Sequence, residues 1–368
     1  MTRAAARTFG PCAAAMYLLM LTAPLRAPGR SVELHLGRPL EIGRQEITFG
    51  SVASICEGHD GNFFVLDGKE LKVFEFSSEG RLLRAFGQKG QGPGDFQSPD
   101  LILLTARKEI AVHEISYVSS FREDGTFIRR LELNGRLGLV SLGPDRFLGW
   151  QWRPESRQQI MLDGKNNVVA TFYSQPRDSF STLLVDETGR AVMFNYSSDV
   201  YVPELLFGYG GGMGLVGISD RYDLTLLDGN GAVTGSIRRD VRPGKVSGRE
   251  REYLEGQIRE FAKARNWPSR AVAEMVKKIP GSKVLIRAVR VSPRNVFVFR
   301  VADDVTREDG PAPVDIFSHR AEFLGSATMS GIPLFVSDKA MYFVEMDEAG
   351  NEYVKRTEFS LGSDGGTR

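Results

Sequence analysis

The chain has 368 residues, of which 42% are hydrophobic and 25% are charged, and 47 basic residues balance 46 acidic ones to give a net charge of +1. This composition excludes a disordered chain and a protein that lies mostly within a membrane. The near-zero charge excludes a global field that would attract nucleic acid or an anionic membrane, so we expect no nucleic-acid partner.

The first 29 residues have the pattern of a secretory signal. Two arginines precede an apolar stretch at Ala13–Leu25, and small residues follow at Ala27-Pro28-Gly29. The apolar stretch is shorter than the roughly 20 residues that span a bilayer. We therefore expect an exported protein, periplasmic or extracellular, in which residues 30–368 form one domain without a stable membrane span. An uncleaved N-terminal anchor is the alternative.

A strand–turn–strand unit recurs along the rest of the chain. The first copy runs from Val73 to Phe86 across a turn at Ser78-Glu79-Gly80. Further copies turn at Asp124-Gly125, Asp163-Gly164, Asp228-Gly229-Asn230-Gly231 and His319-Arg320. Because each short meander has an apolar face that it cannot bury alone, the repeat predicts a radial array of small antiparallel sheets, an all-β propeller.

Grouping the strands in fours gives the number of blades. Blades are expected at 51–86, 101–133, 137–172 and 284–328, while the C-terminus offers only three strands between 333 and 359. A strand within 32–49 is expected to complete this last blade and to join both ends of the chain. Six further strand-like runs lie between residues 180 and 239, which is more than a single four-stranded blade can hold. We expect six blades, with seven as the alternative.

The apolar period changes to that of helices between residues 246 and 280. Ser247 and Glu250 match a capping box, and the helix that follows is expected to run to about Arg265. Ser269 is expected to cap a second helix that stops at Pro280. The segment 246–280 is therefore predicted to be a helical hairpin inserted between two blades.

Two segments carry a resemblance to a known family. The stretch Phe86–Pro99, FGQKGQGPGDFQSP, resembles the link between blades in NHL-type six-bladed β-propellers of secreted bacterial proteins. The stretch from Asp220 to Asp240, followed by a helical pair, is similar to one subgroup of these propellers. The resemblance implies a six-bladed fold and little chemistry, because most members are binding or scaffolding domains and a few relatives are metal-dependent lactonases or lyases.

Topology places the connection between the second and third strands of each blade on the same face as the links between blades. Loops on a rigid scaffold commonly supply binding residues, so this face is the expected binding surface. The candidate binding residues on it are His113, Glu114, Trp152, Arg153, Asp220, Arg221, Tyr222, Asp303 and Asp304. The hairpin belongs to the same face and has a local excess of basic residues, which favours an acidic patch or an anionic ligand.

No catalytic residue can be assigned. The histidines lack zinc-binding spacing, no G-x-S-x-G elbow is present, and the glycines at 87–94 lack the Lys-Ser/Thr pair of a phosphate loop. The sequence predicts no cofactor and no metal site, and a calcium site assembled from separate blades stays an open alternative. The leading hypothesis is an exported protein that binds a protein, peptide or glycan. The alternative is a metal-dependent hydrolase or lyase with its site at the central channel.

Overall fold

The computed structural model describes most of the chain that follows the expected signal. The described residues are 32–43, 47–115, 117–133, 136–143, 146–176, 181–185, 191–195, 201–303, 306 and 310–362. The expected signal segment and the candidate residue Asp304 lie outside these ranges.

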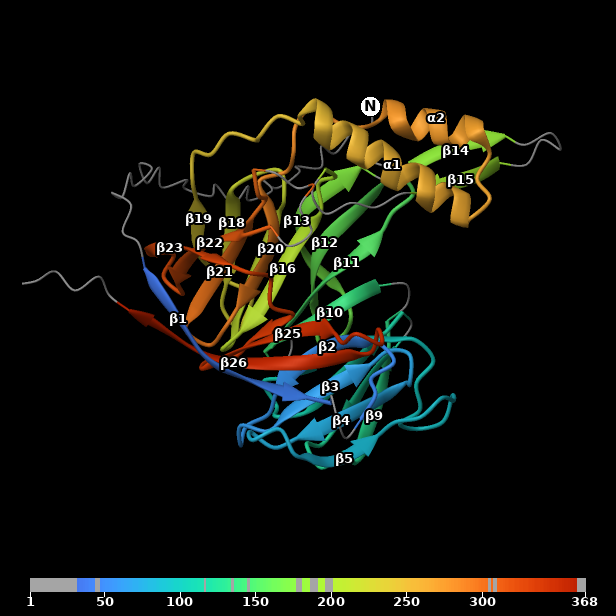
Figure 1. The fold of residues 1–368 in the computed structure, drawn as a ribbon. Coiled ribbons are helices and arrows are strands. Elements are labelled where there is room, and N and C mark those ends of the chain that lie inside the picture. The colour runs from blue at the N-terminus through green and yellow to red at the C-terminus, as the bar shows by residue number, and fades with distance from the viewer. Residues whose placement is uncertain are drawn as a thin grey trace, which may run out of the picture.

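Six four-stranded antiparallel sheets are arranged as the blades of a propeller (Figure 1). Blade 1 contains β2 (Val52–Glu57), β3 (Phe63–Asp67), β4 (Lys72–Phe76) and β5 (Leu82–Phe86). Blade 2 contains β6 (Pro99–Leu104), β7 (Ile110–Glu114), β8 (Tyr117–Phe121) and β9 (Phe127–Glu132). Blade 3 contains β10 (Arg136–Gly143), β11 (Arg146–Trp152), β12 (Ser156–Asp163) and β13 (Val168–Pro176).

The second half of the ring follows the same plan. Blade 4 contains β16 (Leu205–Gly210), β17 (Met213–Ile218), β18 (Asp223–Leu227) and β19 (Val233–Arg238). Blade 5 contains β20 (Ile286–Val291), β21 (Asn295–Arg300), β22 (Ala312–Ser318) and β23 (Phe323–Met329). Blade 6 contains β24 (Phe335–Val336), β25 (Ala340–Met346), β26 (Glu352–Gly362) and β1 (Glu33–Ile42).

Both ends of the chain meet in blade 6. β1 pairs antiparallel with β26 from Glu33 opposite Gly362 to Ile42 opposite Val354, with an irregularity between Leu36 and Pro39. This confirms the expected closure of the ring by an N-terminal strand. The pairing satisfies the backbone groups along one edge of β26, which would otherwise be exposed.

The six runs between 180 and 239 divide into one blade and one additional hairpin. β14 (Ser181–Val185) and β15 (Ala191–Asn195) form a separate two-stranded sheet beside the helices, and the remaining four strands form blade 4 (Figure 1). The prediction of six blades is therefore confirmed, and the seven-blade alternative is wrong.

The repeated turn seen in the sequence recurs in five blades with the same backbone geometry. The fourth residue of each turn has a positive φ, and a β-bulge follows where the third and fourth strands pair. These positions are Gly80, Gly125, Asn166, Gly231 and Ala321. This combination is typical of three-residue hairpin loops, which explains why glycine and asparagine predominate there.

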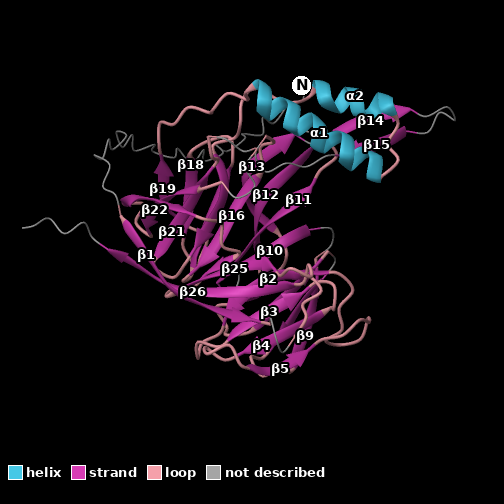
Figure 2. Cartoon of the chain, viewed as in Figure 1, coloured by secondary structure: helices cyan, strands magenta, loops and turns pink. Residues whose placement is uncertain are grey.

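The two helices lie together on one side of the strands (Figure 2). α1 (Gly248–Ala264) begins with the predicted capping box, in which Ser247 and Glu250 bind each other's backbone N–H groups. α2 (Ser269–Lys277) follows, but its N-cap is Pro268 and no side chain caps it, so the predicted cap at Ser269 is wrong. No described helix is both long and apolar enough to span a bilayer.

Large apolar side chains fill the spaces between neighbouring blades. Phe63 and Tyr342 join blades 1 and 6 with their ring centroids 5.3 Å apart. Phe207 and Tyr209 of β16 pack against the buried cluster formed by Leu103 of β6 and Ala111 of β7, so blades 2 and 4 are in contact. The described blades thus form one continuous scaffold.

Candidate functional site

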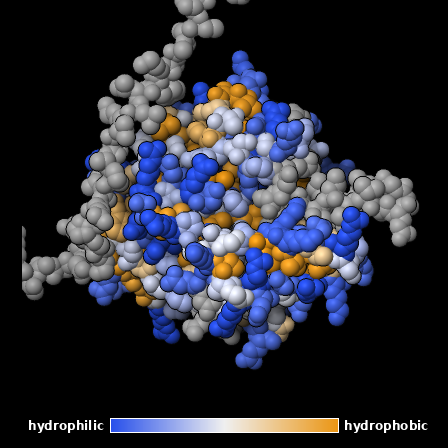
Figure 3. Space-filling view, turned by 90° about the horizontal axis from the view of Figure 1, so that it is seen from above, coloured by the Kyte–Doolittle hydropathy of each residue, from blue (hydrophilic) through white to orange (hydrophobic). Residues whose placement is uncertain are grey.

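The loops that connect the second and third strands lie on the same face as the links between blades, and we call it the top face. The helical hairpin arises from one of these links, between β19 and β20. Its apolar side packs on Tyr201 and Val202 before β16 and on Val301 after β21. Viewed from above, hydrophilic side chains cover much of the surface, with smaller apolar areas between them (Figure 3).

In blades 1 and 2, an acidic residue at the end of the second strand stabilises the link that leads into the same blade. Asp67 accepts hydrogen bonds from the N–H groups of Gly50 (2.6 Å) and Ser51 (3.1 Å). Glu114 does the same for residues 97 and 98, at 2.5 and 2.9 Å. Because these carboxylates are buried and occupied by backbone donors, Asp67 and Glu114 have a structural role in shaping the top face.

The structure places His113 inside blade 2. Its side chain is buried and Nδ1 has no hydrogen-bond partner among the described atoms. Burial lowers the pKa of His113 to about 3, so the imidazole is neutral at ordinary pH. His113 and Glu114 therefore lie below the surface, apart from the other candidate residues.

A chain of polar contacts runs across the top face from blade 3 to blade 4. Trp152 is half exposed, and the guanidinium of Arg157 lies over its ring, 5.8 Å from the centroid. Arg157 also forms an ion pair with Glu204, whose backbone N–H donates to Ser219 Oγ at 2.8 Å. Trp152 and its exposed neighbour Arg153 are thus held at the junction of blades 3 and 4.

Blades 4 and 5 are joined by a buried carboxylate. Asp315 on β22 is 0% exposed, and its Oδ2 accepts a hydrogen bond from Tyr222 Oη at 2.6 Å. The same oxygen forms ion pairs with Arg239 and, at 3.4 Å, with Arg300 Nε. Ser326 donates to Oδ1 at 2.6 Å. The sequence candidate Tyr222 is therefore buried, with its hydroxyl committed to Asp315.

Two arginines share this single carboxylate, and we call Arg239 and Arg300 the arginine pair. Their side chains are 36% and 34% exposed, although Nε of Arg300 is buried and has no hydrogen-bond partner among the described atoms. The ring of Phe323 lies 4.9 Å from the guanidinium carbon of Arg239 and restricts that side chain. The cluster has two positive charges and one negative charge, which leaves a net charge of +1 at the surface.

The pKa shifts agree with this arrangement. Burial, followed by the adjacent Asp315, raises the pKa of Tyr222 well above its usual value, so the phenol stays protonated and donates. Burial opposes the charge of Arg239, but Asp315 outweighs this effect and raises the pKa of Arg239. Arg239 therefore stays cationic in the folded protein.

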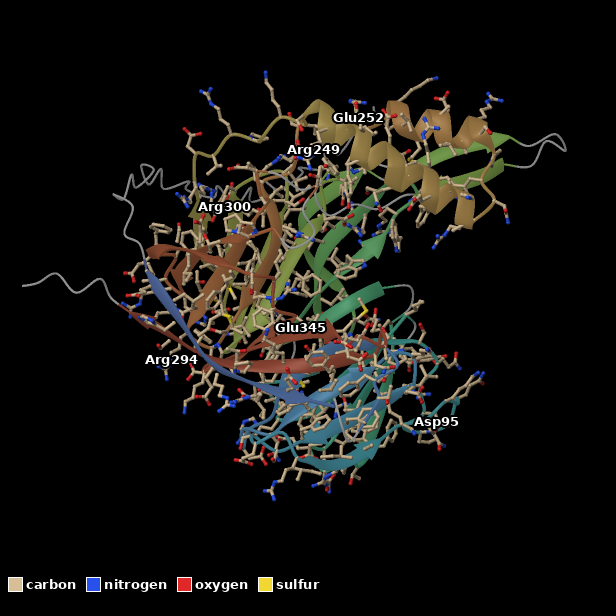
Figure 4. The ribbon with its side chains drawn as sticks, viewed as in Figure 1. Asp95, Arg249, Glu252, Arg294, Arg300 and Glu345 are labelled. Carbon is tan, nitrogen blue, oxygen red and sulfur yellow. The ribbon has the colours of Figure 1, made fainter. Side chains whose placement is uncertain are left out.

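The hairpin is attached next to this cluster. Lys283 Nζ forms a buried ion pair with Glu250 Oε1 at 2.8 Å and donates to the carbonyl oxygen of Asp303 at 2.6 Å. Arg300 is the last residue of β21, and the loop that follows it is thus tied to the start of α1. Figure 4 shows Arg300 in the same upper part of the molecule as Arg249 on α1, whereas Glu345 and Asp95 lie lower in the view.

The remaining candidates lie at the surface around this junction. Asp220 and Arg221 form the turn before β18, where Arg221 Nε lies 3.7 Å from Asp220 Oδ1. Asp303 is exposed and contributes its backbone to the hairpin attachment. The structure thus gathers Trp152, Arg153, Asp220, Arg221, Tyr222 and Asp303 on the top ends of blades 3 to 5.

Potential metal ligands are not clustered among the described residues. No three histidine, cysteine, aspartate or glutamate side chains among them are grouped as metal ligands. The contact between blades 2 and 4 is made by apolar side chains, including Leu103 and Phe207. The prediction that the protein uses no cofactor stays a prediction.

Sequence reasoning missed the arginine pair and its carboxylate. Asp315 lies within the apolar strand Val314–Phe317, and an aspartate inside such a run indicates a buried charge that needs partners. This was the available signal. Its two arginine partners lie 76 and 15 positions away in the chain. Arg300 meets it when β21 pairs with β22 within blade 5, and Arg239 meets it only after blades 4 and 5 have packed.

Comparisons with known proteins support the fold. No family model and no curated protein sequence matches the chain. A protein of Bacteroides fragilis assigned as exported is 10% identical, with a TM-score of 0.53 over 89% of this chain and 95% of its own. A member of the DUF4221 family from Bacteroides vulgatus is 12% identical, with a TM-score of 0.52 over 91% and 100%.

A third similar structure is an enzyme. Virginiamycin B lyase from Staphylococcus aureus is 9% identical, with a TM-score of 0.42 over 89% of this chain and 99% of its own. That likeness is too distant to support an argument about activity. At these identities the comparisons show a six-bladed propeller fold and leave the NHL-type family as a prediction.

Proposed function

We propose that this protein is an exported binding protein that recognises an anionic group of a peptide or glycan partner on the top face of blades 4 and 5. The observation that carries the proposal is the arginine pair, in which two partly exposed arginine side chains share one fully buried carboxylate. The similarity to a structure assigned as exported and the expected N-terminal signal support the location.

The arginine pair has the chemistry needed for anion recognition. Arginine presents planar N–H donors that match carboxylate and phosphate oxygens, and such charge-assisted bonds are about twice as strong as neutral ones. Asp315 holds Arg239 by a hydrogen bond and forms an ion pair with Arg300, so part of the side-chain entropy is lost before a ligand arrives. The remaining N–H groups and the net charge of +1 favour a carboxylate, sulfate or phosphate group.

Neighbouring residues would extend the contact beyond one anion. Trp152 is exposed, held by Arg157, and suited to stacking on a sugar or a peptide side chain. The hairpin is attached beside Arg300 through Lys283, so it would partly cap a bound partner. The exposed Arg221 adds a further cation on blade 4.

The test is a comparison of acidic and neutral ligands on peptide and glycan arrays, probed with the wild-type protein and with Arg300→Gln. We expect wild type to bind preferentially to acidic members, and Arg300→Gln to lose that preference. Arg238→Gln is the matched control, because Arg238 is adjacent to the pair but forms an exposed ion pair with Asp223 at 3.0 Å. Equal binding of acidic and neutral members by wild type would contradict the proposal.

A further inference from the structure

A cavity of about 870 Å³ lies between blades 5 and 6, away from the arginine pair. Its walls come from three places in the chain: β1 at Leu36–Pro39, the link between the two blades at residues 330–332, and the paired strands β25 and β26 of blade 6. Pockets that hold small organic ligands have volumes of about 300–1,000 Å³. The cavity has the size of a ligand site.

One part of the cavity wall is apolar. Leu36, Ile332, Phe343 and Met346 line it, and Met346 is 71% exposed although it is a large hydrophobic residue. Leu36 is also exposed, at 44%. An apolar ligand group placed here would remove these two side chains from water, which is favourable.

The other part is polar and acidic. Glu345 accepts hydrogen bonds from Tyr353 Oη at 2.7 Å and from Lys355 Nζ at 2.6 Å, and its side chain is still 39% exposed. Glu352 also lines the cavity, and its Oε2 accepts a hydrogen bond from the N–H of Val52 in blade 1 at 2.6 Å. Two carboxylates and one ammonium group give the cavity lining a net charge of −1.

A buried hydroxyl provides an independent indication of a missing partner. Thr357 lines the cavity and is only 4% exposed, yet its Oγ1 has no hydrogen-bond partner among the described atoms. Buried polar atoms are nearly always paired in folded proteins, so this group is expected to find a partner in a bound molecule.

We infer that this cavity is a second binding site, for a small amphipathic cation that has an apolar body and an amine. The apolar body lies against Ile332, Phe343 and Met346, and the amine donates to the carboxylate of Glu345. The inference is independent of the anion site, because the two sites have opposite charge and lie at different junctions between blades.

Binding at this site has a consequence for the ring. The cavity exists only while β1 is paired with β26, since β1 forms one wall. A molecule that binds only this closed state stabilises it by mass action. The ligand would therefore stabilise the junction where the two ends of the chain meet.

The test uses three probes of equal shape and different charge: 4-phenylbutylamine, 4-phenylbutanol and 4-phenylbutyrate. We expect the amine to bind most tightly, the alcohol less tightly and the carboxylate least tightly in calorimetric titrations. Hydrogen exchange of the wild-type protein should slow in residues 36–39, 330–332 and 343–346 when the amine is added, and should be unchanged in β5.

Two variants separate the polar and apolar contributions. Glu345→Gln should weaken binding of the amine by about tenfold, which is the effect of losing a hydrogen bond to a charged group. It should leave the affinity for the alcohol unchanged. Met346→Ala should weaken binding of the amine and of the alcohol alike. Because Met346 is exposed, this variant should fold, which circular dichroism checks. Glu348→Gln, in the turn after β25 and outside the cavity, should bind as wild type does.

The outcomes are decisive. Equal affinity for the amine and the carboxylate, or amine binding that neither Glu345→Gln nor Met346→Ala alters, would overturn the inference. Protection from exchange at residues other than the cavity walls would overturn it as well. Arg300→Gln should bind the amine as wild type does, which keeps failure of this site distinguishable from failure of the anion site.

Discussion

Lys283 and Glu250 form a buried ion pair, with Nζ 2.8 Å from Oε1, that attaches the helical hairpin to blade 5. Burial acts against the charge of Glu250, but the interactions with Lys283 and Ser247 together outweigh it and lower the pKa of this carboxyl. Glu250 also closes the capping box of α1 through the N–H of Ser247. One carboxylate thus both starts the helix and fixes its position on the top face.

Removing Lys283 should detach the hairpin. Lys283→Met leaves Glu250 buried without its counter-ion, and breaking a buried pair in this way costs about 3–5 kcal/mol. Lys277→Met is the matched control, because Lys277 pairs with Glu274 at the exposed surface and such pairs contribute about 0–1 kcal/mol. Hydrogen exchange in residues 248–277 should accelerate strongly for Lys283→Met and little for Lys277→Met. Similar rates in both variants would show that the ion pair does not hold the hairpin.

The link between blades 1 and 2 should be sensitive to a single methyl group. Gly87 has a φ of +85°, and a Cβ there would lie 2.2 Å from Cε2 of the fully buried Phe96. Gly350 has a similar φ of +82°, but a Cβ there would have no atom within 4 Å. Both alanine variants carry the left-handed strain of about 1–2 kcal/mol, and overpacking should destabilise Gly87→Ala by about 1–3 kcal/mol more. Denaturant unfolding measures the difference, and equal losses in the two variants would contradict this packing.

The buried His113 should make stability depend on pH. Its folded pKa of about 3 lies below the unfolded value of about 6.5, so the unfolded chain binds a proton first as pH falls. The contribution is therefore favourable above pH 6.5 and is lost progressively below it. Between pH 7.5 and 5.5, wild type should lose about 1.4 kcal/mol more unfolding free energy than His113→Leu. A parallel pH dependence of the two proteins in urea unfolding would show that His113 titrates normally.

Ring closure should depend on β1. A chain that starts at residue 44 lacks β1 and exposes the backbone edge of β26, which invites association between molecules. We expect this chain to melt at a lower temperature and to form oligomers in light scattering, while a chain that starts at residue 31 stays monodisperse. A shortened chain that kept the melting temperature and the size of the longer one would show that β1 is dispensable.

The repeat was predictable because it depends on local patterns. Turn residues such as Gly80 and Gly125 are needed wherever the backbone takes a positive φ, and the alternation of apolar residues defines the strands between them. Ring closure also followed from counting strands. The extra hairpin β14–β15 was ambiguous, because a short strand pair has the same pattern inside a blade as outside it.

The candidate site was less predictable, because it depends on where side chains point after packing. Glu114 and Trp152 both end the second strand of a blade, yet one is occupied by backbone N–H groups and the other is exposed. Their sequences do not distinguish these outcomes. Asp315 and Arg300 meet within blade 5 only through the strand pairing of β21 and β22, and Arg239 joins them from blade 4.

The most direct measurement is a calorimetric titration of an acidic array ligand into wild type, Arg300→Gln and Arg238→Gln. Removing one of two charge-assisted contacts should weaken binding by Arg300→Gln by about 10–100-fold, whereas Arg238→Gln should stay within about twofold of wild type. The melting temperature of each variant shows that the fold is intact. Unchanged affinity in Arg300→Gln, or an equal loss in Arg238→Gln, would contradict binding at the arginine pair.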